Sequence, residues 1–381
     1  MGEWIRKNRL DVLVLTVGLI IFCLCAYWAN SGKEERDPSG QPAVYENAKV
    51  IEVLSDSTAP DENADGGYRG EQMLTAEVTT GEFKGQTMLV YNYVGPLYNV
   101  PVHVGDSVTL IISTYDDGSH TATVYEYNHS AILPILLALF VIAIIVVGGK
   151  SGIKSLIGLV FMAITLFTIL LPGLLKGAPT ILMTFLMCVF SALFTYTVMS
   201  GVNKKTVCAF LGTIAGMAMA LAFAEIAQSL LRINGLRITD AEALLQLRQT
   251  GTPIGLKGLL SAGVVISSLG AVMDVAMGLA SAVSELHEAN SELTFRELFT
   301  SGMNIGKDMV GTMTSTLILA LLGGELVLMI YLYSLGLGKY QLLSSAYVSV
   351  EAVSALSCSI GVILSIPITN FVSAKVFSAH K

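Results

Sequence analysis

From residue 131 to its end, the chain is a succession of long apolar segments separated by short polar turns. A helix that crosses the hydrocarbon core of a bilayer needs about 20 mostly apolar residues. Charged residues make up 13% of the chain, about half the 25% that is usual in soluble domains. This pattern predicts an all-α multi-pass membrane domain and excludes a soluble enzyme, a disordered chain and a disulfide-rich secreted domain. The candidate spans are 131–147, 153–175, 178–198, 206–231, 256–284, 309–335 and 347–374.

An eighth span is expected at the N-terminus. Residues 10–29 form an apolar run that follows Arg6, Lys7 and Arg9. A cleaved signal peptide is the alternative, but the run is long for one and large residues stand where a cleavage site needs small ones. We therefore favour a retained anchor, with residues 1–30 as a cytoplasmic tail and first span.

Residues 31–128 differ in character from the rest of the chain. Runs rich in Val, Thr, Tyr and Ile alternate partly with polar residues and are separated by Gly, Asp and Asn, which predicts about five short strands. We expect a small all-β domain, an OB-like barrel, inserted between the first and second spans. Residues 33–128 hold 16 acidic and 5 basic residues, a net charge of -11. Nucleic acid is therefore not an expected partner, because phosphate binding needs positive charge.

Basic residues orient membrane proteins, because Lys and Arg are enriched in cytoplasmic loops. With the N-terminus inside, the inner segments hold eleven Lys and Arg residues and the short outer loops hold six. Both termini are then cytoplasmic, residues 31–128 are extracytoplasmic, and residues 129–381 form a seven-helix membrane body. The outer loop 232–257 is an exception to this distribution, because it holds four of the six outer basic residues. Within it, Thr239 and Glu242 form a capping-box pattern that predicts a short surface helix.

The span 256–284 carries small and polar residues on one helical face. Their steps of three and four residues place them in one stripe. Glycine and serine at this spacing fit a helix–helix contact. Asp274 does not, because a carboxylate inside a span costs at least about 2.5–3.5 kcal/mol and usually faces a cavity or a partner. The stripe consists of Gly263, Ser267, Gly270, Asp274, Gly278, Ser281 and Glu285.

A second polar cluster, residues 301–316, leads into the span 309–335. Asp308 and Thr312 are expected near the start of a helix, where free backbone N–H groups could face a bound ion or solute. An N-cap beside a snorkelling Lys307 is the alternative. Residues 301–307 also repeat the pattern of residues 200–206, as a weak internal repeat.

Carboxylates recur on the last two spans. Glu325 shares a face with Asp308, Gly311 and Ser315, and is interpreted as the outer gate of a pathway; a Glu snorkelling to the outer surface is the alternative. Glu351 begins a further stripe on the last span, which continues with Ser354, Cys358, Gly361 and Ser365. The three stripes suggest one interior path. The predicted pathway residues are Asp274, Glu285, Asn304, Asp308, Thr312, Ser315, Glu325 and Glu351, and the glycines expected to pack helices are Gly263, Gly270, Gly278, Gly311 and Gly361.

Sharper catalytic motifs are missing from the sequence. The segment VGGKS at 147–151 lacks the first glycine of a phosphate-binding loop. The five histidines lie outside the predicted spans, so we expect no metal site and no cofactor. An intramembrane aspartyl protease using Asp274 and Asp308 is a weak alternative, and the chain is not expected to be an enzyme.

The chain resembles the YibE/F family of bacterial multi-spanning membrane proteins. The resemblance rests on GAVMDVAM at 270–277 with Ser281 and Glu285, and on SGMNIGKDMVGTMTSTLILA at 301–320. It extends to GGK at 148–150, to NKKT at 203–206 and to GEFKG and VGD in the exported domain. Gly278 and Ser315 differ from the usual pattern, which puts the ligand preference at these positions in doubt. The resemblance implies a bacterial plasma membrane and a permease-like body, but no substrate.

Two functions follow from these observations. The first is a transporter or permease for a small solute or ion, with carboxylates in the membrane coupling transport to protons or cations. The alternative is a non-catalytic membrane scaffold or sensor whose external β domain binds a partner. The expected partners are the lipid bilayer and a small solute or ion, with a homo-oligomer or an external protein also possible.

Overall fold

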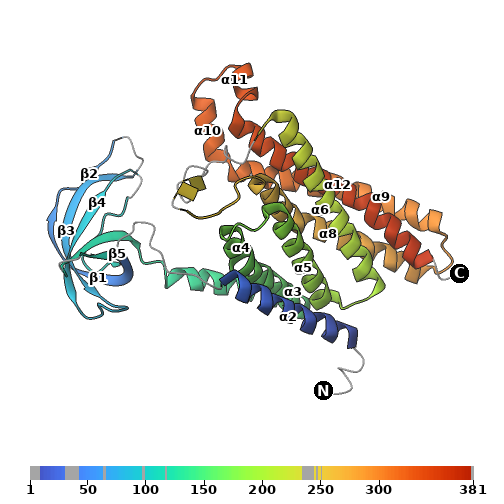
Figure 1. The fold of residues 1–381 in the computed structure, drawn as a ribbon, viewed down its shortest axis with the longest axis horizontal. Helices are drawn as coiled ribbons and strands as arrows, with labels where there is room; N and C mark the ends of the chain where they lie inside the picture. Colours follow the sequence, from blue (N-terminus) through green and yellow to red (C-terminus); the bar gives the residue numbers. More distant parts are fainter. Residues whose placement is uncertain are drawn as a thin grey trace. The chain divides into compact units, whose positions relative to one another are not determined.

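The computed structural model describes residues 9–30, 43–62, 66–96, 99–115, 118–233, 244–245, 248–249 and 251–378. The chain divides into two compact units (Figure 1). One unit combines Met1–Ser31 with Ile144–Lys381, and the other is Gly32–Ala143. The predicted boundary lay at residue 128, whereas this division falls inside a helix that follows the β domain.

The smaller unit is built around a closed β-barrel. Its strands follow one another in the order β1-β5-β6-β4-β3, and a further pairing of β1 with β3 closes the ring. β4 and β6 run parallel, and the other neighbours in the ring are antiparallel. About five strands in a small barrel were predicted, and this is confirmed; one parallel closing pair agrees with an OB-like Greek key. The strands are β1 (Ala43–Asp56), β2 (Ala59–Pro60), β3 (Tyr68–Val78), β4 (Thr87–Val94), β5 (Ser107–Thr114) and β6 (His120–Tyr127).

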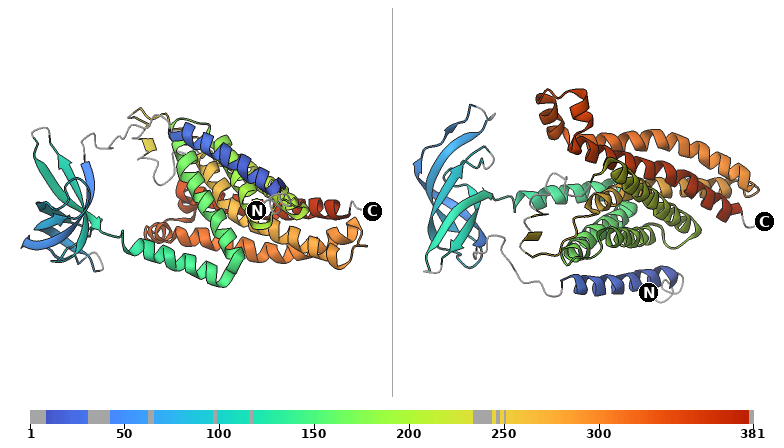
Figure 2. Two further views of the ribbon diagram at one scale, coloured as in Figure 1. Left: turned by 90° about the horizontal axis from the view of Figure 1, so that it is seen from below. Right: turned by 45° about the horizontal axis from the view of Figure 1, so that its top comes forward.

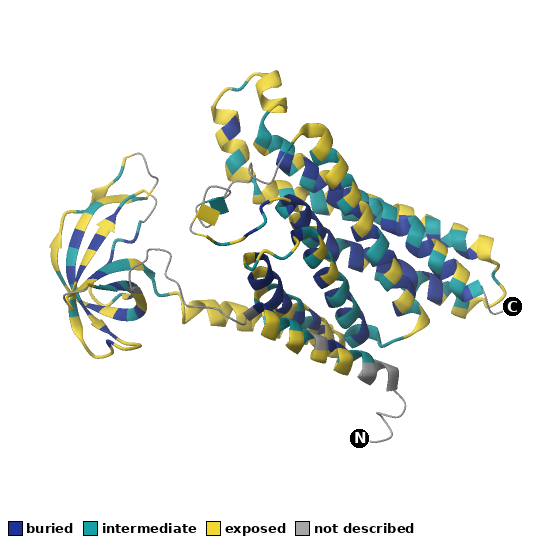
Figure 3. Cartoon of the chain, in the orientation of Figure 1, coloured by how far each residue is buried: buried dark blue, intermediate teal, exposed yellow. Residues whose placement is uncertain are grey.

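Alternation along the strands builds the core of the barrel. Successive side chains of a strand point to opposite faces, and in β4 the buried residues Val90, Asn92 and Val94 alternate with exposed ones. Leu74 of β3 and Leu110 of β5 are fully buried in the same cluster. Figure 3 shows this alternation as buried and exposed positions that follow one another along the strands.

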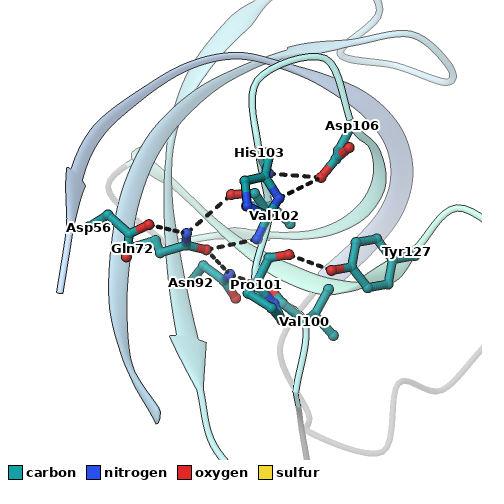
Figure 4. Close-up of polar contacts among 9 residues, drawn as sticks. All are labelled: Asp56, Gln72, Asn92, Val100, Pro101, Val102, His103, Asp106 and Tyr127. Atoms are coloured by element: carbon teal, nitrogen blue, oxygen red, sulfur yellow. Dashed lines mark hydrogen bonds and ion pairs between the residues drawn. The ribbon is translucent and has the colours of Figure 1, made fainter. Parts of the chain in front are cut away.

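A loop between β4 and β5 covers part of this core, and two buried amides hold it (Figure 4). The Gln72 amide accepts a hydrogen bond from the backbone N–H of Val102 at 2.9 Å and donates one to the Val102 carbonyl at 3.1 Å. Asn92 donates to the Val100 carbonyl at 2.7 Å and to the Gln72 side-chain oxygen at 2.9 Å. The side chains of Val100 and Val102 are thereby held in the barrel core.

We expect the barrel to lose stability in acid through Asp56. The pKa of its carboxyl lies below the ordinary value because the Thr58 hydroxyl, the Thr58 N–H and the Gln72 amide donate hydrogen bonds to it. Because the pKa of Asp56 is lowered in the folded state, its carboxylate stabilises the folded barrel above the unfolded pKa of about 4, and this contribution disappears as the pH falls through the folded pKa.

Thermal unfolding of the full chain, followed by near-UV circular dichroism from pH 6 to pH 3, measures the effect. Asp56→Asn should flatten the pH dependence, whereas Glu52→Gln, at an exposed position of β1, should not. Equal pH dependence in wild type and Asp56→Asn would contradict the assignment.

The larger unit is helical. Six helical segments within the described residues are long and apolar enough to cross a membrane: Ile132–Leu175, Thr180–Ser200, Lys204–Leu231, Leu259–Ala289, Phe295–Gly324 and Ala346–Ser378. Their length and composition support a multi-pass membrane protein, although the predicted count of eight spans is not settled by them. The helices are α2 (Arg9–Asn30), α3 (Ile132–Thr165), the π-helix η1 (Leu166–Leu170), α4 (Leu171–Leu175), α5 (Thr180–Ser200), α6 (Lys204–Leu231), α8 (Leu259–Ala289), α9 (Phe295–Gly324), α10 (Leu326–Ser334), α11 (Lys339–Leu343) and α12 (Ala346–Ser378).

Gly149 interrupts α3. Its φ of 53° and ψ of −132° lie outside the helical region, in a conformation that glycine adopts without the steric cost of a Cβ. The interruption separates two arms that correspond to the predicted spans 131–147 and 153–175. The count of eight depends on counting these arms separately and adding α2.

The helical core forms where α8 meets its neighbours. α8 contacts α5, α6, α9 and α12, and α9 and α12 run side by side (Figure 2). Fully buried Val272, Val275 and Leu279 of α8 belong to this core. Thr239 and Glu242, which were predicted to open a short surface helix, lie outside the described residues.

Candidate functional site

α9 begins well before the position that the sequence analysis proposed. Its first residue is Phe295, and Thr294 caps it: the Thr294 hydroxyl accepts from the Glu297 N–H, and the Glu297 carboxylate accepts from the Thr294 N–H at 2.8 Å. Asp308 and Thr312 therefore lie inside a continuous helix, where backbone N–H groups are already bonded. The prediction that they stand at a helix start was wrong.

The weak repeat has no structural counterpart either. Asn203 is the N-cap of α6, and its side chain accepts a hydrogen bond from the Thr206 N–H at 2.9 Å. Asn304 occupies the matching sequence position, but it is an exposed residue within α9. The two asparagines thus have different local roles.

The predicted span 309–335 is also broken near its end. α9 stops at Gly324 and α10 starts at Leu326, with Glu325 between them at a φ of −97° and a ψ of 17°. Gly323 and Gly324 precede the break, and glycine is about 1 kcal/mol less favourable than alanine within a helix. Glu325 therefore stands at a junction of two helices.

A cavity of about 730 Å³ lies beside this junction. Residues from the end of α9, from α10 and α11, and from the first turns of α12 line it. Glu325 and Glu351 are the two carboxylates among the lining residues, so the structure brings together two predicted site residues from different helices. The lining residues are Leu321, Leu322, Glu325, Leu328, Met329, Leu332, Tyr333, Gly336, Leu337, Leu342, Val348, Glu351, Ala352 and Ala355.

The two carboxylates share an otherwise apolar environment. Both side chains are half-buried, and neither forms an ion pair with a residue that the structure describes. Both line one cavity whose other lining residues include no basic side chain. Within the described segments no group of three His, Cys, Asp or Glu side chains is placed to hold a metal ion. The arrangement suits a proton or a single positive charge between Glu325 and Glu351.

The stripe on α8 is exposed rather than packed. Asp274 and Glu285 are exposed, and the opposite face of α8 is buried. Asp274 lies midway along α8, fifteen residues from each end, and its carboxylate has no hydrogen bond to a described residue. Cβ atoms built at Gly263 and Gly270 would meet open space, and one at Gly278 would lie 3.2 Å from the Met309 side chain. This face therefore meets solvent, lipid or another molecule.

The remaining pathway residues lie on α9. Asn304, Asp308, Thr312 and Ser315 are exposed, and a Cβ at Gly311 would meet open space. Gly263, Gly270 and Gly311, which were expected to pack helices, contact no other described helix at their Cβ positions.

Gly361 is a predicted packing glycine that lies directly against the backbone of another helix. A Cβ there would be 2.7 Å from the Ala220 Cβ and 2.9 Å from the Gly216 carbonyl oxygen. Beyond Glu351, the α12 stripe of Cys358, Gly361 and Ser365 is therefore buried against neighbouring helices, whereas the α8 stripe is exposed. The three stripes do not line a single open path.

The sequence analysis missed the apolar part of the cavity. Leu328, Leu332 and Tyr333 of α10 line it, but the prediction treated them as the continuing end of one span. The Gly323–Gly324 pair was the available signal of a break. The Thr294-x-x-Glu297 pattern was likewise the available signal of the true start of α9.

Comparison with known proteins supports the sequence resemblance. The family model described as "YibE/F-like protein" matches residues 136–379, which is more than half of the chain and extends from the first arm of α3 through α12. No curated protein and no solved structure matches the chain. The matched region contains the cavity, the stripe on α8 and the whole of α9. The chain belongs to the YibE/F family.

Proposed function

We propose that the protein is a transporter of a small solute or ion in the plasma membrane. In this proposal both termini are cytoplasmic and the barrel is extracytoplasmic, as the distribution of basic residues favours. Six long apolar helical segments support a multi-pass protein. The observation that carries the transport function is the cavity with Glu325 and Glu351.

The position of the cavity fits such a role. Transporters often bind substrate where a membrane helix is interrupted, because the interruption places polar groups beside a cavity. Here the interruption between α9 and α10 places Glu325 on the cavity wall, opposite apolar side chains and together with Glu351 of α12. Carboxylates within membrane helices are costly and are retained mainly for ion or proton movement. Glu325 and Glu351 would bind the transported or coupling cation.

Asp274 has a separate place in the proposal. It is exposed at the middle of α8, and a carboxylate in contact with lipid would cost at least about 2.5–3.5 kcal/mol. A water-filled approach along the α8 stripe would remove that cost. Asp274 would then conduct or attract cations without contacting the cavity.

Flux measurements in proteoliposomes test the function. Vesicles containing the purified full chain and a luminal pH dye are exposed to proton or sodium gradients and to a panel of inorganic and organic cations. We expect at least one cation to enter faster than into empty vesicles, and Glu325→Gln and Glu351→Gln to reduce that rate about tenfold or more, because removing a charged partner costs at least about 1.4 kcal/mol. Glu292→Gln, in the exposed turn before α9, serves as the control.

Several outcomes would count against the proposal. Equal rates in empty vesicles and in vesicles with protein, for every cation and gradient, would overturn it. Equal flux in wild type and Asp274→Asn would remove Asp274 from the mechanism while leaving the cavity residues in place.

A scaffold or sensor is the second candidate, and one feature of the barrel favours it. Tyr45, Tyr91, Tyr93 and Tyr125 are exposed on its outer face, and the rings of Tyr45 and Tyr125 meet edge to face at 5.2 Å. Exposed tyrosines are enriched where proteins bind one another. This candidate predicts no flux of any cation, together with loss of partner binding in Tyr91→Ala or Tyr93→Ala.

A further inference from the structure

The lining of the cavity limits the chemistry of what it can hold. Apart from Glu325, Glu351 and the hydroxyl of Tyr333, every lining side chain is apolar. A volume of about 730 Å³ lies within the range of about 300–1,000 Å³ that small organic ligands occupy. The wall therefore offers a large apolar surface and two carboxylates.

A small inorganic ion fits this lining poorly. Calcium takes six to eight oxygen ligands and magnesium keeps several of its waters, whereas the cavity offers two carboxylates and one phenol. An anion fits less well still, because two carboxylates line the cavity and no lining residue is basic. An organic cation fits this lining, because its positive charge can pair with the carboxylates and its apolar groups can pack against the leucines.

We propose that the cavity binds a lipophilic organic cation, meaning a quaternary ammonium, a phosphonium or a protonated aromatic amine. This inference rests on the proposed transport function and names its substrate class. The positive centre lies between Glu325 and Glu351, and the apolar groups contact Leu328 and Leu332. Tyr333, also in the lining, adds a ring face that attracts cations within about 6 Å.

Binding of tetraphenylphosphonium to the purified full chain in lipid nanodiscs tests the substrate class. Equilibrium dialysis of the labelled cation measures it, and the displaceable fraction separates site binding from partition into lipid. Tetraphenylborate has nearly the same shape and the opposite charge, so it is the matched control ligand. We expect displaceable binding of the cation and none of the anion.

Variants connect this binding to the cavity. Glu325→Gln and Glu351→Gln should weaken it about tenfold or more, and Glu292→Gln should leave it unchanged. Ala352→Trp keeps both carboxylates and fills the apolar space, so it should also abolish binding; gel filtration checks that each variant remains folded. Equal displaceable binding of both ions, or binding that survives all three cavity variants, would overturn the proposal and indicate an acyl-chain site.

The dialysis needs no gradient, so its result is independent of transport. If tetraphenylphosphonium binds through Glu325 and Glu351 but does not enter proteoliposomes, the transport function fails and the binding site stands. If an inorganic cation crosses in a manner that depends on these carboxylates and tetraphenylphosphonium does not bind, transport stands and the substrate class is wrong.

Discussion

Gly216→Leu should strongly destabilise the helical unit. A Cβ at Gly216 of α6 would lie 2.6 Å from the Val272 side chain, 2.8 Å from the Ser365 Cβ and 3.0 Å from the Gly361 carbonyl oxygen. Two of these atoms belong to backbone or to the base of a side chain and cannot rotate away. Overpacking costs typically 1–3 kcal/mol, and with helices on two sides we expect about 3 kcal/mol or more.

Gel filtration of detergent-solubilised protein after stepwise heating measures this effect. Gly263→Leu is the matched control, because a Cβ at Gly263 meets open space on the exposed face of α8. It should remain monodisperse at temperatures where Gly216→Leu has aggregated. Indistinguishable heating profiles for the two variants would show that α6 does not approach α8 and α12 this closely.

Gln72→Leu should have the second largest effect, on the barrel. The substitution places an apolar side chain at a buried polar position and leaves the Val102 N–H, the Val102 carbonyl and one Asn92 N–H without partners. A buried polar group left unsatisfied costs about 1–3 kcal/mol, so the total should reach about 3 kcal/mol or more. The loop that covers the core would then detach from β3.

Hydrogen exchange of the full chain, read by mass spectrometry on barrel peptides, resolves this loss. Peptides containing Val100 and Val102 should lose protection in Gln72→Leu, while peptides from the helices should not. Gln86→Leu, at an exposed position before β4, is the control. Unchanged protection of the loop in Gln72→Leu would mean that the amide network does not hold it.

The barrel was predictable because its signals are local. Alternation along 72–78 and 87–94 and the turn residues between the runs place the strands, and closing the ring through the β1–β3 pairing removes the open strand edges. The loop held by Gln72 and Asn92 was not predictable, because two buried amides in strands look like ordinary polar alternation. Their partners are backbone atoms of Val100 and Val102, which a sequence does not display.

The membrane spans were predictable from length and apolarity, and their ends were less so. α9 was placed too late because residues 295–308 include the four charged residues Arg296, Glu297, Lys307 and Asp308. Hydropathy alone does not distinguish such a helical extension from a loop. The capping box formed by Thr294 and Glu297 marks the true start of α9. The break at Glu325 was missed because Leu, Val and Met on both sides of Gly323 and Gly324 conceal it.

The candidate site, too, was predictable only in part. Glu325 and Glu351 could each be singled out, because a carboxylate in an apolar segment is costly wherever the segment packs. Their meeting in one cavity could not be predicted, since Glu351 lies 26 positions after Glu325, with α10 and α11 between them, and only packing decides whether the two side chains meet. The same holds for Asp274. Its spacing from the neighbouring small and polar residues places it in the stripe on α8, but does not show whether another helix covers that stripe.

The thin packing of α10 and α11 has a consequence for the rate of any transport cycle. Leu332 is the one buried residue of α10, and α11 has none, whereas the contacts of α6 and α12 involve glycines at backbone distance. Segments with few buried contacts open at low free energy, and loop-scale motions take nanoseconds to microseconds, against microseconds to milliseconds for whole domains. We expect α10 and α11 to move first, so that a ligand reaches Glu325 and Glu351 quickly. The slow step of a transport cycle is then any movement in which α6, α8 and α12 move together.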